Sequence, residues 1–80
     1  MCKVKAKVLR GSIKSERVAY ITTAEGIQTE VLLNAAQTGT EHILAAEIAR
    51  DNGNVLIELP QETSSGYWRV WVKENQIVGK

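Results

Sequence analysis

Cysteine, histidine and proline are scarce in this chain of 80 residues, which has one of each and no phenylalanine. The single cysteine, Cys2, cannot form a disulfide within the chain, so no disulfide framework supports the fold. A zinc site needs three or four Cys, His or carboxylate ligands brought together, and Cys2 and His42 stand forty positions apart. The sequence therefore predicts no metal site and no cofactor.

The side chains that nucleophilic catalysis requires are also missing. Such catalysis needs a nucleophile beside a base that a third group orients. His42 is the only histidine, and no nucleophile-elbow motif accompanies it. The six glycines are scattered singly, so no glycine-rich loop is present to cradle a phosphate. We therefore expect a protein that is not an enzyme and has no catalytic residues, with His42 partly exposed at the surface.

Long apolar runs are absent as well. No stretch approaches the roughly 20 residues of a membrane span, and the N-terminus lacks the apolar segment and cleavage pattern of a signal peptide. Together with the lone cysteine, these absences predict a cytoplasmic protein without a membrane partner.

The composition is that of an ordinary globular domain. Hydrophobic residues make up 44% of the chain and charged residues 24%, which argues against disorder. Eighty residues leave room for one small domain, 1–80, with a modest core. The net charge is only +1, but bases dominate the first seventeen residues and acids dominate residues 25–62, where Arg50 is the single base. This balance favours neither a nucleic acid nor a protein partner.

An apolar period of two dominates the chain and predicts β-strands. Glycine, asparagine and the single proline separate the alternating runs. Ala24-Glu25-Gly26 fits a three-residue hairpin in which Gly26 is left-handed, and 74–76 fits a single helical turn. The strands we expect cover residues 3–8, 17–23, 27–33, 55–59, 67–72 and 77–78.

Residues 41–51 are ambiguous between a helix and a strand. Three alanines and a helical spacing of apolar residues favour a helix, and Asn52-Gly53 could terminate it. The same Asn-Gly pair is a strong two-residue hairpin signal when a β-prone run follows, as it does here. The strand is favoured because it continues the meander, and a short helix at about 41–51 remains the alternative.

These elements predict an all-β protein, a small SH3-like or similar meander barrel of five to six strands. The alternative is an α+β fold with that one short helix. The ending, residues 71–78, reads Trp-Val-Lys-Glu-Asn-Gln-Ile-Val and resembles the last part of SH3-like barrels, where a strand, a tight turn and a short strand close the sheet. The resemblance covers about a dozen residues, and it implies a binding module rather than an enzyme.

Three of the four aromatic residues lie close together, at positions 67, 68 and 71. If Trp68, Val70 and Val72 face the core, the opposite face carries an exposed row that could stack on a ligand while its cations bind an anionic group. The competing interpretation is that the rings only cover one end of a small barrel. The candidate binding surface consists of Tyr67, Arg69, Trp71 and Lys73.

A second feature is the run Lys3, Lys5 and Lys7, whose side chains would stand about 6.6 Å apart along one face of a strand. This candidate basic patch could bind backbone phosphates by counterion release. The competing interpretation is an edge strand whose lysines repel other strands.

The protein function we expect is a non-catalytic protein-binding or assembly module, with a protein partner or a second copy of the chain. The alternative is a nucleic-acid-binding barrel that combines the aromatic row with the lysines.

Overall fold

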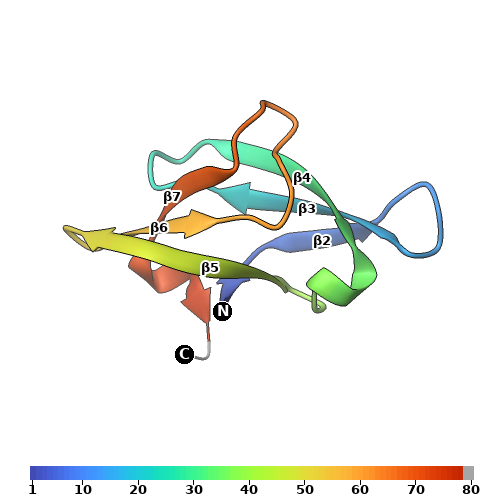
Figure 1. Ribbon diagram of the computed structural model, residues 1–80, viewed down its shortest axis with the longest axis horizontal. Coiled ribbons are helices and arrows are strands. Elements are labelled where there is room, and N and C mark those ends of the chain that lie inside the picture. Colours follow the sequence, from blue (N-terminus) through green and yellow to red (C-terminus); the bar gives the residue numbers. More distant parts are fainter. Residues whose placement is uncertain (79–80) are drawn as a thin grey trace.

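The computed structural model describes residues 1–78, and its regular structure is almost entirely β (Figure 1). The only helical elements in that part of the chain are two single turns of 3-10 helix, η1 and η2. The all-β class expected from the sequence is therefore confirmed, but residues 1–78 form eight strands in two sheets rather than a closed barrel of five to six strands. The elements are β1 (Cys2–Lys5), β2 (Lys7–Arg10), β3 (Glu16–Thr22), β4 (Gln28–Asn34), η1 (Ala35–Gln37), β5 (His42–Asp51), β6 (Asn54–Glu58), β7 (Arg69–Lys73), η2 (Glu74–Gln76) and β8 (Ile77–Val78).

The strands form two antiparallel sheets. One sheet has five strands in the order β7-β6-β5-β1-β8, and the other has three in the order β2-β3-β4. Strands β1 and β2 follow each other directly and are separated only by Ala6, whose backbone N–H donates to the carbonyl of Glu41 (3.1 Å). The single strand expected at 3–8 is thus two strands, because the chain passes from one sheet to the other at this buried alanine.

The five-stranded sheet is bent at β5, the longest strand. The register with β6 shifts between Glu47 and Ala49, a β-bulge of the kind that bends a strand and increases its twist. The first part of β5 pairs with β1 and the second part with β6.

The connection through η2 shows that the same sheet curls strongly. Strands β7 and β8 lie at opposite edges of the sheet, which would be about 19 Å apart if it were flat. The three residues of η2 join them, and the four Cα steps from Lys73 to Ile77 reach at most about 15 Å. The two edges must therefore approach each other.

Alternation along the strands fills one core shared by the two sheets. The buried cluster draws on both sheets and includes Val4, Ala19, Ile21, Val31, Leu33, Ile43, Ala45, Val55, Ile57, Leu59 and Val72. The consecutive leucines of β4 show the alternation directly: Leu33 is 3% exposed and Leu32 is 52% exposed. Leu32 lies opposite Val18, which lies opposite Leu9, so an apolar row crosses the outer face of the three-stranded sheet.

Residues 42–51 form strand β5, and the helix considered as an alternative at about 41–51 is wrong. The physical reason is burial, since Ile43 and Ala45 alternate into the core and this outweighs the helical preference of alanine. The turn that follows has positive φ at both central residues, 50° at Asn52 and 79° at Gly53, as the expected two-residue hairpin requires. Gly26 is also left-handed, with φ of 86°, which confirms the conformation expected for the β3–β4 turn.

None of the helical segments in residues 1–78 is long and apolar enough to cross a membrane.

Candidate functional site

A groove of about 580 Å³ lies between β7 and the β3–β4 hairpin. One wall is formed by residues 23–29 of that hairpin, and the other by Tyr67, Arg69, Val70 and Trp71. Asp51 and Asn54, which flank the β5–β6 turn, and Ser65 complete the lining. Three of the four side chains predicted as a binding surface therefore share one groove.

The hairpin wall is held against β7 by a backbone hydrogen bond. The N–H of Ala24 donates to the carbonyl of Trp71 (2.8 Å). Within the turn, the N–H of Gly26 donates to the carbonyl of Thr23 (2.8 Å), and the N–H of Thr23 donates to the carbonyl of Ile27 (2.8 Å). These bonds fix the position of the turn beside the aromatic strand.

The loop before β7 is held by Thr63, which is 4% exposed. Its hydroxyl accepts the N–H of Tyr67 (3.0 Å), and its own N–H donates to the Tyr67 carbonyl (2.8 Å). The next residue, Ser64, donates its N–H to the carbonyl of Glu30 in β4 (2.9 Å). Tyr67 is therefore anchored through its backbone, although the residue as a whole remains 62% exposed.

The four predicted surface residues have different positions relative to the groove. The exposed fraction is 39% for Trp71, and Arg69 and Lys73 are also exposed. Lys73 does not contribute to the groove lining. On the other face of β7, Val72 is buried and Val70 is partly buried, as expected.

The expectation that Trp68 faces the core is wrong, since its side chain is 49% exposed. The strand begins at Arg69 rather than at Tyr67, so alternation along β7 does not extend to this ring. The carbonyl of Trp68 accepts the N–H of Leu59 (2.8 Å), which fixes its backbone beside the end of β6.

The outer edge of β7 presents backbone groups on the side away from β6. In an antiparallel pair, successive residues alternate between bonding to the partner strand and pointing away from it. The carbonyl of Trp71 bonds to Ala24 and so points away from β6. Arg69, two residues earlier in the same strand, therefore also directs its N–H and C=O outward, and within the described residues neither group has a hydrogen-bond partner.

The charges around the groove are unequal. Arg69 lies opposite Glu58 in β6 and forms an ion pair with it (3.5 Å), although both side chains are about half exposed and such pairs contribute little energy. The carboxylates of Glu25 and Asp51 also line the groove, and neither takes part in an ion pair within residues 1–78. The groove therefore carries an excess of negative charge.

The predicted lysine patch lies elsewhere. Lys3, Lys5 and Lys7 are all exposed, but β1 lies between β5 and β8, so the edge-strand interpretation is wrong for Lys3 and Lys5. Only Lys7 belongs to an edge strand, β2. Lys5 and Lys7 line a separate hollow of about 510 Å³ together with Tyr20 and Gln76. None of the three lysines lines the β7 groove.

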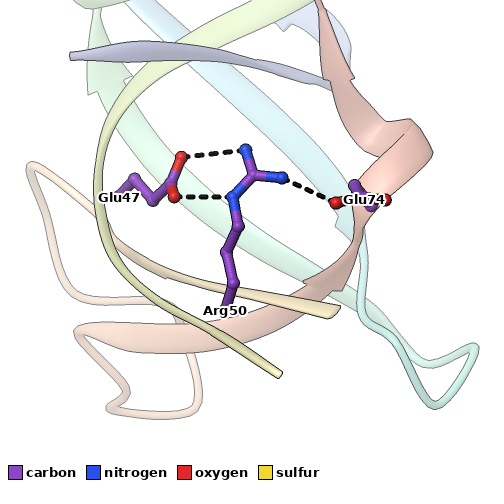
Figure 2. Close-up of polar contacts among 3 residues, drawn as sticks. All are labelled: Glu47, Arg50 and Glu74. Carbon is purple, nitrogen blue, oxygen red and sulfur yellow. Dashed lines mark hydrogen bonds and ion pairs between the residues drawn. The ribbon is translucent and has the colours of Figure 1, made fainter. Parts of the chain in front are cut away.

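Figure 2 shows a second polar cluster, in which Arg50 binds two carboxylates. Its Nε and Nη2 donate to the two oxygens of Glu47 (2.7 and 3.1 Å), and its Nη1 donates to Glu74 (2.7 Å). The hydrogen bonds that Arg50 donates to Glu47, and then the charges of both carboxylates, raise the pKa of Arg50. Because Glu47 lies at the β5 bulge and Glu74 in η2, the cluster ties the bend in the sheet to the turn that precedes β8.

The remaining side chains that could be reactive or bind a metal lie apart from one another. Cys2 is half-buried, and its burial, followed by the charge of Glu47, raises the pKa of its thiol, which disfavours the reactive thiolate. His42 is partly exposed, as expected. No group of three or more His, Cys, Asp or Glu side chains in the described part of the chain is placed to hold a metal ion.

Sequence reasoning missed the wall of the groove opposite β7. The β3–β4 turn and the β5–β6 turn were expected as connections, but nothing in their composition indicates that they meet β7. Thr63 lies outside the strands expected from the sequence, yet it is buried. Its burial depends on long-range contacts with β4 that no local pattern encodes.

Comparison of the chain with protein-family models, with curated proteins and with solved structures finds no match. The function must therefore be argued from the geometry of the groove and of its surroundings.

Proposed function

We propose that the protein is a small, non-catalytic protein-binding module that holds a segment of its partner in the β7 groove. The observation that supports this function most directly is the convergence of Tyr67, Arg69 and Trp71 in one hollow. Aromatic and arginine side chains are enriched among the residues that dominate binding energy at protein interfaces.

The finer assignment of the architecture, an SH3-like barrel, belongs to the same proposal. It is supported by the ending β7–η2–β8, in which a strand, a tight turn and a short strand follow one another. Strand β8 pairs with β1 rather than with β7, so the C-terminal strand forms the opposite edge of the curled sheet, and the two edges approach each other without closing a barrel within the residues that the structure describes. In such a module the connections between strands form the walls of the binding groove.

The nucleic-acid alternative has weaker support. It requires the aromatic row and the lysines to act together, but the lysines line no part of the groove. The two carboxylates of the groove, Glu25 and Asp51, would repel a phosphate backbone.

Self-association remains a second candidate because of the apolar row on the outer face of the three-stranded sheet. Leu9 is 45% exposed and Leu32 is 52% exposed, and they flank Val18 in register. If this row forms a dimer interface, sedimentation velocity should detect a dimer that Leu32→Lys converts to a monomer. A wild-type protein that sediments as a monomer at high concentration would argue against this candidate.

The main test is selection of binding peptides from a displayed library of random sequences. We expect selected peptides to bind the wild-type protein saturably and to lose at least about tenfold in affinity with Trp71→Ala. Leu32→Ala is the matched control, because Leu32 is also exposed and apolar but lies on the other sheet. Selected peptides that bind both variants like the wild type would show that the groove is not the binding site.

A titration with a mixed-sequence single-stranded oligonucleotide distinguishes protein binding from the nucleic-acid alternative. Trp71 would report base stacking through its fluorescence, and the protein-binding proposal predicts a flat titration at low salt. Saturable quenching that weakens steeply as salt is added would instead favour nucleic-acid binding.

A further inference from the structure

We infer that the segment bound in the groove is an extended, basic peptide that adds as a strand to the outer edge of β7. This inference rests on the proposed protein-binding function and specifies the chemistry of the partner. It is supported by the free backbone groups of Arg69, by the two exposed rings on either side of this residue, and by the negative charge of the lining.

The backbone of Arg69 supplies the pairing groups. Its N–H and C=O point away from β6 and have no hydrogen-bond partner within residues 1–78. A residue opposite Arg69 in an added antiparallel strand would exchange two hydrogen bonds with it. The Ala24–Trp71 bond closes the edge at the next outward-pointing carbonyl, so the added pairing is short and centred on Arg69.

The rings of Tyr67 and Trp71 define where the side chains of the peptide would bind. They stand two residues before and two residues after Arg69, with exposed fractions of 62% and 39%. The backbone of Tyr67 is bonded to Thr63, and the carbonyl of Trp71 to Ala24. Backbone pairing is therefore limited to Arg69, and the peptide side chains two positions to either side of the central residue would extend toward the two rings. Long side chains at those two positions could therefore cover the rings.

The charge of the groove indicates that these side chains are cationic. Glu25 and Asp51 line the groove and form no ion pair within the described residues, whereas Arg69 is already paired with Glu58. A lysine or arginine side chain could contact both a ring and a carboxylate. Its stem or charge packs on the aromatic face, and its charge interacts with the carboxylates. An acidic segment would meet repulsion from both carboxylates.

The probe is a capped heptapeptide of sequence Thr-Lys-Val-Thr-Val-Lys-Thr, which places lysines two positions to either side of the central threonine. Binding is measured by isothermal titration calorimetry at low salt. We expect replacement of both lysines by glutamate to weaken binding at least tenfold. Glu25→Gln and Asp51→Asn should each weaken binding of the lysine peptide about twofold to fivefold, as expected for exposed charges.

Strand addition itself is tested by N-methylation of the peptide. The amides of the central threonine and of the two lysines would face β7, and the amides of the two valines would face away. Because the carbonyls of Tyr67 and Trp71 are already bonded to Thr63 and Ala24, only the amide of the central threonine meets a free carbonyl, and its methylation should weaken binding about fivefold. Methylation of the valine amides is the matched control and should change the affinity less than threefold. In the protein, exchange of the Arg69 amide proton should slow when the lysine peptide is bound.

The results separate this inference from the proposed function. Peptides that need Trp71 but are acidic, or that tolerate methylation of the central threonine amide as well as that of the valine amides, would overturn strand addition and leave the protein-binding function standing. Failure of the display selection to yield any Trp71-dependent peptide would count against the proposed function itself.

Discussion

Leu32 and Leu33 are consecutive in β4, and their replacement by alanine should have very different effects on stability. Leu33 points into the core and is 3% exposed, whereas Leu32 points outward and is 52% exposed. Truncation of a buried leucine to alanine typically lowers the free energy of unfolding by about 2–5 kcal/mol, because it removes buried apolar surface and leaves a cavity. Truncation of Leu32 removes a side chain that is half in solvent, and we expect it to cost less than about 1 kcal/mol.

The size of the effect relative to total stability makes it easy to measure. A domain of 80 residues has a free energy of unfolding of about 4–12 kcal/mol, so Leu33→Ala should remove a large part of it. Urea unfolding followed by far-ultraviolet circular dichroism gives this free energy directly. With a denaturant slope near 1 kcal/mol per molar urea, the midpoint for Leu33→Ala should fall by about 2 M or more.

The two variants also test the register of β4. A shift by one residue exchanges every inward side chain of a strand for an outward one. If Leu32→Ala cost as much as Leu33→Ala, or more, the register of β4 against β3 would be incorrect. The apolar row formed by Leu9, Val18 and Leu32 would then not exist.

Two further predictions concern the turn after β5 and the half-buried thiol. Gly53→Ala should lower the free energy of unfolding by about 1–2 kcal/mol, because φ at this position is 79° and a residue with a Cβ is strained in that conformation. No neighbouring atom obstructs the added Cβ, so the cost comes from the backbone alone. An unchanged urea midpoint would contradict the left-handed turn. The thiol of Cys2 should react with iodoacetamide more slowly at pH 8 than a free cysteine, because its raised pKa lowers the thiolate fraction. Glu47→Gln removes one of the causes of that rise and should speed the reaction, and an equal or slower rate would show that the carboxylate does not influence the thiol.

Local pattern was sufficient to predict most strands and turns of this protein. The strand at residues 17–23, the Gly26 turn and the Asn52–Gly53 hairpin all occur within a residue or two of their expected places. The expected helical turn at 74–76 is η2. These features depend on residues that are neighbours in sequence, where the period of apolar residues and the conformational freedom of glycine determine the outcome.

Features that depend on distant segments were not predictable in this way. Alternation could not show that the chain changes sheets at Ala6, because the apolar period continues through the break. The short turn η1 was also missed; in it the side chain of Asn34 accepts the N–H of Ala36, and the side chain of Gln37 accepts the N–H of Asn34. At the candidate site, the exposed row on β7 was anticipated from alternation, but the opposite wall and the Arg50 cluster depend on pairings across the fold.

The position of β1 between β5 and β8 has a consequence for how the protein folds. Val4 pairs with Ile43 on one side and with Ile77 on the other, so completion of this sheet joins segments from both halves of the chain. Pairings over such long sequence separations slow folding. Until β8 docks, the outer edge of β1 is open to other chains, and Lys3 and Lys5 stand on that strand. In any state of the chain in which β8 is detached, the charges of these lysines would oppose edge-to-edge association of the open sheet.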